Sequence, residues 1–238
     1  MLVDSSALPE QVVKDVIASA FLSAGQRCSA LRVLYLQEEV ADHILKLLAG
    51  AMQELVVGDP RKLSTDVGPV IDQDALAILS AHAARMETEG RLVARARLPA
   101  NLAGHFFAPG AWEIGSIRQL RREVFGPILH VIRYRARDLD SVIDEINDAD
   151  YGLTLGIHTR IDRTRDYISS RVKAGNCYVN RNMIGAVVGV QPFGGERLSG
   201  TGPKAGGPHY MYRFATERTL TINTAAVGGN AGLLALEE

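Results

Sequence analysis

Helical and strand-like patterns alternate along most of this sequence, and that alternation limits the possible folds more than any other feature. Residues 128–134 (ILHVIRY) are almost continuously apolar, which is typical of a strand covered on both faces. The patterns predict helices over 9–25, 38–56, 73–89, 139–149 and 162–171, and strands over 31–36, 91–98, 105–112, 128–134, 153–159, 175–180 and 218–223. Elements in this order predict an α/β fold with a mostly parallel sheet flanked by helices.

The composition is that of an ordinary globular protein. The 238 residues are 47% hydrophobic and 22% charged, which excludes the disordered, collagen-like and coiled-coil classes. With 26 basic and 27 acidic residues the net charge is −1, so the bulk charge favours neither nucleic acid nor an anionic membrane as a partner. The sequence contains no apolar run long enough for a membrane span and does not start with a signal-peptide pattern, so we expect a cytoplasmic protein.

The chain has two cysteines, and their surroundings differ. They are too few for a disulfide framework and lack the CxxC spacing of zinc sites, so no metal site is expected. Cys28 follows Gly25 and Arg27 in a polar stretch, which suits a reachable thiolate nucleophile, although a small buried side chain is the commoner role of a free cysteine. Cys177 lies inside an expected strand and is interpreted as core packing.

Glycine is concentrated in one stretch near the end of the chain. Eight of the 23 glycines lie between Gly185 and Gly207, together with Pro192 and Pro203 and followed by Pro208, which predicts a long ordered loop rather than a helix or strand. Residues 200–205 fit the degenerate pattern GxGxxA of dinucleotide-binding loops. The prolines interrupt the helix that this motif requires, so the pattern favours a functional loop of another kind.

Glu123 stands just before the buried strand at 128–134, in the segment REVFGP. If that segment is a loop at the carboxyl side of the sheet, an ionised carboxylate there could accept hydrogen bonds from two ribose hydroxyls. A solvated glutamate in a turn is the alternative. The residue type alone does not separate the two.

Four motifs, in this order and spacing, resemble the catalytic domain of the aldehyde dehydrogenase superfamily: GQRCS at 25–29, EVFGP at 123–127, NDADYGLTLGIHT at 147–159 and PFGGERLSG at 192–200. Within it, the stretches SAFLSAGQRCSALRVLYLQ and GNCYVNRNMIGAVVGVQPFGG are similar to the C-terminal half of the bifunctional proline utilization A family. That resemblance covers about residues 10–222. It implies oxidation of L-glutamate γ-semialdehyde, in equilibrium with 1-pyrroline-5-carboxylate, to L-glutamate with NAD in proline catabolism.

The resemblance also implies roles for single residues. Cys28 is expected to be the nucleophile that forms a thiohemiacetal and then a thioester, with its backbone N–H as half of the oxyanion hole. Glu123 is expected to bind the nicotinamide ribose and Phe125 to pack near the ring of NAD.

Four further residues are expected to bind the substrate. Ser29 and the backbone of Gly185 and Ala186 would anchor its α-carboxylate, since exposed backbone N–H groups form an anion-binding concavity. Phe193 would line the path of the aliphatic chain.

The resemblance implies that part of the machinery lies outside this chain. Only 27 residues precede Cys28, whereas the family places the NAD-binding domain and the water-activating glutamate upstream of the cysteine. We therefore expect residues 1–222 to be the catalytic domain, 223–238 a C-terminal tail, and Leu2-Val3 a cut edge. The isolated chain is then expected to be inactive and to depend on the NAD-binding domain of the same polypeptide. FAD would belong only to a proline dehydrogenase domain outside the chain.

Two other functions stay open at this point. The chain could be a non-catalytic module that keeps the fold for assembly, because members of the family form homo-oligomers through the strand and tail that correspond to residues 216–226. It could also belong to an aldehyde dehydrogenase with a different substrate.

Overall fold

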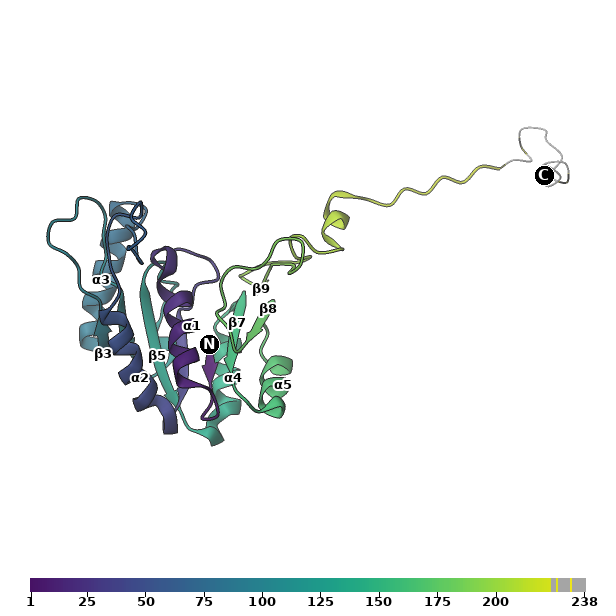
Figure 1. Cartoon of the computed structure of the whole chain (residues 1–238). Coiled ribbons are helices and arrows are strands. Elements are labelled where there is room, and N and C mark those ends of the chain that lie inside the picture. The colour runs from purple at the N-terminus through teal and green to yellow at the C-terminus, as the bar shows by residue number, and fades with distance from the viewer. Residues whose placement is uncertain (224–225, 227–231, 233–238) are drawn as a thin grey trace.

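The computed structural model describes residues 1–223, 226 and 232, and its main feature is a seven-stranded sheet (Figure 1). The strand order is β3-β4-β5-β2-β1-β7-β8, and all neighbours are parallel except β3 and β4. The strands are β1 (Leu2–Val3), β2 (Val33–Gln37), β3 (Arg91–Arg95), β4 (Gly110–Glu113), β5 (Ile128–Tyr134), β7 (Thr154–His158) and β8 (Asn176–Val179). The expected α/β fold with a mostly parallel sheet is confirmed.

Helices cover both faces of this sheet (Figure 1). They are α1 (Pro9–Phe21), α2 (Glu38–Gln53), α3 (Gln73–Glu89), α4 (Leu139–Asp148) and α5 (Asp162–Arg171). The helices α1 and α2 pack against each other on one face, α3 lies toward the β3 edge, and α4 and α5 lie on the other side. A small second sheet pairs β6 (Tyr151–Gly152) with β9 (Glu196–Arg197). Within the described residues, none of the helices has the length and apolarity needed to cross a bilayer.

The two-residue strand β1 lies inside the sheet, between β2 and β7. Leu2 pairs with Tyr35 of β2 on one side and with Ile157 of β7 on the other, and both β1 residues are buried. No strand is predicted here from the sequence, because two residues are too few to show a period. The pair at the start of the chain therefore joins the two halves of the sheet.

Besides shorter ends at the helix expected over 38–56, which ends at Gln53, and the strand expected over 91–98, which ends at Arg95, the structure differs from the sequence expectations at three elements. The helix expected over 9–25 ends at Phe21, and residues 22–25 turn in another direction. The strand expected over 105–112 begins at Gly110, since Pro109 has no N–H to donate to a ladder. The strand expected over 218–223 is wrong: this segment extends away from the body (Figure 1), and no strand among the described residues lies beside it.

A buried pair of histidines fastens α3 to β5. The Nε2 atoms of His82 and His130 lie 2.9 Å apart, and Nδ1 of His130 lies 3.0 Å from the backbone oxygen of Arg32. Because a carbonyl only accepts, Nδ1 of His130 carries the proton and its Nε2 accepts the bond from His82. Burial lowers the pKa of each histidine to about 4, so both rings are neutral at pH 7.

We expect acid to destabilise the fold through this pair. The unfolded histidines take up protons below about pH 6.5, while the folded ones stay neutral until about pH 4. The free energy of unfolding should thus fall between these two pH values, by on the order of 1–3 kcal/mol per histidine. Urea titrations from pH 7 to pH 4.5 measure it.

The variant His82→Gln should flatten this decline, since glutamine keeps an N–H donor but does not titrate. The control is His43→Gln, at an exposed position of α2, which should leave the decline as in the wild type. Equal pH dependence in the wild type and His82→Gln would show that the pair does not set acid stability.

Candidate functional site

The loop that carries Cys28 begins with a tight left-handed turn. Three consecutive residues have positive φ: Ser23 at 57°, Ala24 at 53° and Gly25 at 62°. Residues other than glycine seldom adopt this conformation, and such strain is concentrated at functional sites. The turn reverses the chain directly after α1 and leaves Cys28 exposed.

Gly25 brings this loop into direct backbone contact with the EVFGP segment. A Cβ on Gly25 would lie 2.2 Å from the oxygen of Gly126 and 2.8 Å from the oxygen of Ala20. At Gly126 the restriction comes from α3, because a Cβ there would lie 2.4 Å from the side chain of Leu79. Two motifs about 100 residues apart in the chain therefore meet through Gly25, which no other residue could replace without movement of the backbone.

The side chain of Arg32 bridges the same two segments. Its Nη1 donates to the oxygen of Gly25 at 2.7 Å and to that of Gly126 at 3.1 Å, and its Nε donates to Oε1 of Glu123 at 3.2 Å. Burial lowers the pKa of Arg32, while the negative charges of Glu123 and Cys28 raise it. The guanidinium thus lies among the groups on which the candidate chemistry depends.

Glu123 and Phe125 both face solvent beside this arginine. The side chain of Glu123 is 37% exposed, Phe125 is 44% exposed, and Val124 between them is buried. The ring of Phe125 lies 4.8 Å from the Arg32 guanidinium carbon, a cation–π contact. The segment precedes β5, so it lies at the amino end of that strand, and the expected carboxyl-side position is wrong.

Ser19 of α1 connects the Cys28 loop to the start of the glycine-rich stretch. The backbone oxygen of Ser19 accepts a hydrogen bond from the N–H of Leu31 at 2.9 Å, and its side-chain hydroxyl accepts one from the N–H of Met183 at 3.1 Å. Gly185 and Ala186 follow two and three residues after Met183. Gly185 is exposed with φ +71°, and Ala186 is half-buried.

A second connection leads from Ser29 to the region of Phe193. Ser29 is buried, and its backbone oxygen accepts a hydrogen bond from the hydroxyl of Thr154 at 3.4 Å. Thr154 pairs with Asn176 of β8, whose side chain donates to the oxygen of Pro192 at 3.0 Å and accepts from the N–H of Gly194 at 3.3 Å. Phe193, between these two residues, is half-buried. The loops that carry the expected substrate residues are therefore tied to the Cys28 loop.

Cys177 is not a core residue, so that interpretation is wrong. It is exposed on β8, the last strand of the sheet, beside which the described residues place a strand on one side only. Partial desolvation still raises the pKa of its thiol.

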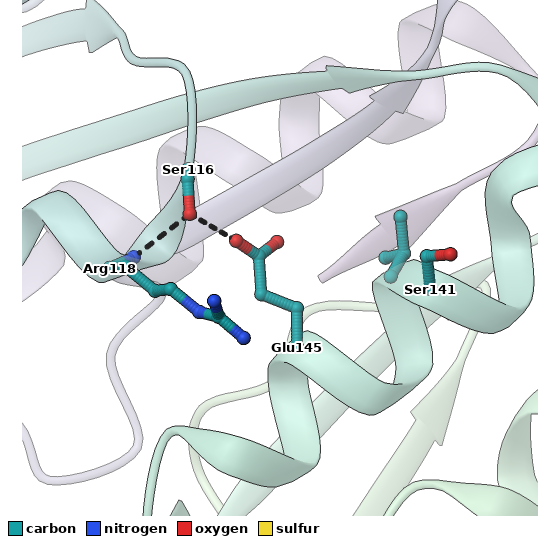
Figure 2. Close-up of a pocket in the computed structure, with 5 residues that line it drawn as sticks. Ser116, Arg118, Ser141 and Glu145 are labelled. Atoms are coloured by element: carbon teal, nitrogen blue, oxygen red, sulfur yellow. Dashed lines mark hydrogen bonds between the residues drawn. The ribbon is translucent and has the colours of Figure 1, made fainter.

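Two shallow pockets lie outside this arrangement. The first has a volume of about 320 Å³ and is lined by Ser116, Arg118, Ser141, Val142 and Glu145 (Figure 2). In it, the Ser116 hydroxyl donates to Glu145 and accepts from the backbone N–H of Arg118. The second, of about 420 Å³, lies in the glycine-rich stretch around Lys204. In the described part of the chain, no group of three His, Cys, Asp or Glu side chains could hold a metal ion.

Three residues that organise the site were not predicted from the sequence. Arg32 and Ser19 connect its segments as described above. Gln26 joins another loop, since its side chain donates to the oxygen of Pro69 at 3.3 Å and accepts from the N–H of Ile71 at 2.8 Å. The polar residues near the cysteine were the available signal. The partners that join them to other segments, Pro69, Gly126 and Met183, lie between 43 and 164 positions away and follow no local pattern.

Cys28 is thus exposed three residues after a strained turn, and its loop is joined through Gly25 and Arg32 to the segment that carries Glu123 and Phe125. The profile of the aldehyde dehydrogenase family matches residues 1–220, and the chain belongs to this family.

Relatives with high sequence identity share a narrower description. The chain is 58% identical over 224 residues to the bifunctional protein PutA of Klebsiella aerogenes and 57% identical to that of Escherichia coli, covering 92% of this chain and 17% of each relative. It is 38% identical to the 1-pyrroline-5-carboxylate dehydrogenase of Bacillus thuringiensis, covering 89% of this chain and 41% of the relative. The chain thus spans about a sixth of the length of the bifunctional relatives.

Solved structures agree with these sequence relatives. A crystal structure of bifunctional proline utilization A superimposes with a TM-score of 0.90 at 59% identity, covering 95% of this chain and 23% of that one. The 1-pyrroline-5-carboxylate dehydrogenase from Thermus with bound NAD gives 0.82 at 34% identity, covering 90% of this chain and 41% of that one.

The contact between Gly25 and Gly126 predicts a large effect of a single methyl group. Gly25→Ala should lower the free energy of unfolding by about 3 kcal/mol, because the methyl group overlaps a backbone oxygen and the residue keeps a positive φ. Chemical denaturation measures the change. The control is Gly50→Ala in α2, where a Cβ has open space; it should be neutral or stabilise by up to about 1 kcal/mol. Equal stability of both variants would contradict the close approach.

Proposed function

We propose that this chain is the cysteine-bearing catalytic part of an NAD-dependent L-glutamate γ-semialdehyde (1-pyrroline-5-carboxylate) dehydrogenase, within a longer bifunctional polypeptide of proline catabolism. The observation that carries this proposal is the fastening of the exposed Cys28 loop to Glu123 and Phe125. The names of the relatives, bifunctional PutA and 1-pyrroline-5-carboxylate dehydrogenase, support the substrate.

Cys28 would act as a covalent catalyst. Its thiolate adds to the aldehyde carbon, and the carbonyl oxygen becomes an oxyanion. The backbone N–H of Cys28 makes no hydrogen bond to another described residue, so it is available as a donor to that oxyanion. Departure of the hydride leaves a thioester on Cys28. Water then cleaves the thioester, releasing L-glutamate and the thiolate.

The residues at the site fit NAD. Glu123 places one oxygen on Arg32 and keeps the other free of hydrogen bonds to described residues, so it can accept bonds from ribose hydroxyls. Phe125 presents an exposed aromatic face beside it. NAD, when bound, accepts the hydride; binding of its adenine half and activation of water would come from elsewhere in the polypeptide.

The substrate would be held by the loops on the other side of Cys28. Ser29 and the backbone N–H groups of Gly185 and Ala186 would anchor the α-carboxylate, and Phe193 would contact the methylene groups. The open space around Gly185 and its positive φ support an anion-binding turn there.

An assembly role is a second candidate and is compatible with the first. The chain between residues 210 and 222 extends away from the body (Figure 1). Large apolar side chains along it are exposed. Met211, Tyr212, Phe214, Leu220 and Ile222 are each 67–74% exposed. Exposure on this scale marks a contact surface, and a homo-oligomer through this arm would cover it. The proposed tail at 223–238 lies almost entirely outside the described residues.

Thiol alkylation tests the nucleophile. Iodoacetamide at pH 7 should modify Cys28 at least several times faster than Cys177, since the raised pKa of the Cys177 thiol leaves less thiolate. Peptide mapping by mass spectrometry follows each site, with the variants Cys28→Ser and Cys177→Ser as mutual controls. Equal rates, or a faster Cys177, would remove Cys28 from the nucleophile role.

A hybrid enzyme tests the activity. In this hybrid the chain replaces the matching segment of the Klebsiella aerogenes PutA, to which it is 58% identical. The hybrid should form NADH from 1-pyrroline-5-carboxylate, and the isolated chain should not. Cys28→Ser should abolish turnover, while Cys177→Ser should keep it within about twofold. Turnover by the isolated chain would refute its dependence on the rest of the polypeptide.

A further inference from the structure

Arg32 holds more of the candidate site together than any of the residues that the sequence singled out. Its side chain is 16% exposed, and its three nitrogens contact four acceptors. Three are backbone oxygens, those of Gly25, Gly126 and Arg27, at 2.7, 3.1 and 3.2 Å. The fourth is Oε1 of Glu123.

These acceptors belong to the two segments that must meet for catalysis. Gly25 and Arg27 belong to the loop of the nucleophile, whereas Gly126 and Glu123 belong to the proposed cofactor loop. A planar guanidinium can address both at once and also stack on the ring of Phe125. A lysine ammonium offers a single point of attachment, so arginine is required for the whole set of contacts.

The backbone of Arg32 is held in place by the buried histidine pair. Its backbone oxygen accepts from Nδ1 of His130, and Nε2 of His130 accepts from Nε2 of His82. Nδ1 of His82 in turn accepts from Nη2 of Arg85 at 3.4 Å. This buried series of bonds reaches from α3 to the residue that immediately precedes β2. The backbone position of Arg32 is therefore fixed. Its guanidinium has little freedom to follow either loop if that loop moves.

We propose that Arg32 is a positioning residue that sets the Glu123 carboxylate and the Phe125 ring relative to the Cys28 sulfur. It occupies one carboxylate oxygen and turns the other toward the place of the ribose. The inference rests on the proposed function, in which a hydride passes from the carbon bonded to Cys28 to the nicotinamide. Such a transfer needs reacting atoms within about 3–3.5 Å, so a small displacement between the loops lowers the rate strongly.

Hydrogen exchange on this chain tests the coupling without any activity. In Arg32→Met, amide protection should fall at least about tenfold at both segments: at Gln26 and Ala30, which donate to Ser23 and Arg27 of the first, and at Ile128, which donates to Gly126 of the second. The other amides of the central strands should keep their protection. Arg32→Lys should give a smaller loss in the same two segments, and it carries the test if Arg32→Met does not fold. The control is Arg133→Met on β5, a 25% exposed arginine that pairs with Glu113 and Asp42 instead.

The hybrid enzyme separates positioning from simple support of the fold. Arg32→Lys should raise the KM for NAD about tenfold and lower kcat, yet leave the p-nitrophenol burst from acylation of Cys28 by p-nitrophenyl acetate within about twofold. Three results would overturn the role of Arg32. The first is a loss of amide protection in only one of the two segments, and the second is the same loss in Arg133→Met. The third is a fall of the p-nitrophenol burst in proportion to turnover. Coupled loosening in a chain whose wild-type hybrid forms no NADH would instead refute the proposed function.

Discussion

The close approach of two backbones at Gly25 and Gly126 is the constraint on which the rest of the site depends. The nucleophile loop and the EVFGP segment come from distant parts of the chain, and they touch because Gly25 has no side chain. Their carbonyl oxygens then lie near enough for one guanidinium to bind both. Without this contact, Cys28 and Glu123 would be two unrelated exposed residues.

The sheet supplies the frame for that contact. Because β2 and β5 are parallel neighbours, with Val33 opposite His130, the segments that precede them arrive side by side at the amino edge of the sheet. The same edge receives the starts of β7 and β8, and with them Thr154 and Asn176. Short loops attached to rigid strands can hold reacting groups precisely, which accounts for a site built at strand ends.

Much of the fold could be predicted from the sequence because it depends on local periodicity. The helix over 73–89 and the strand over 128–134 have the predicted bounds. The two-residue β1 has no period to detect, and the arm at 218–223 has strand-like residues but no strand beside it in the described part of this chain. Strand formation depends on a partner, and the local sequence does not contain that information.

The site was predictable only where a motif carried it: the roles of Arg32 and Ser19 depend on partners far away in the sequence. Cys177 was misjudged because a strand residue is buried only if something covers its side of the sheet.

The identity of the nucleophile is the central claim, and trapping the acyl intermediate tests it most directly. The hybrid enzyme, supplied with 1-pyrroline-5-carboxylate and NAD, would be quenched with acid during turnover and digested for mass spectrometry. We predict a glutamyl thioester on the peptide that contains Cys28, absent when NAD is omitted. Turnover with no acyl group on Cys28, or with the acyl group on Cys177, would contradict it.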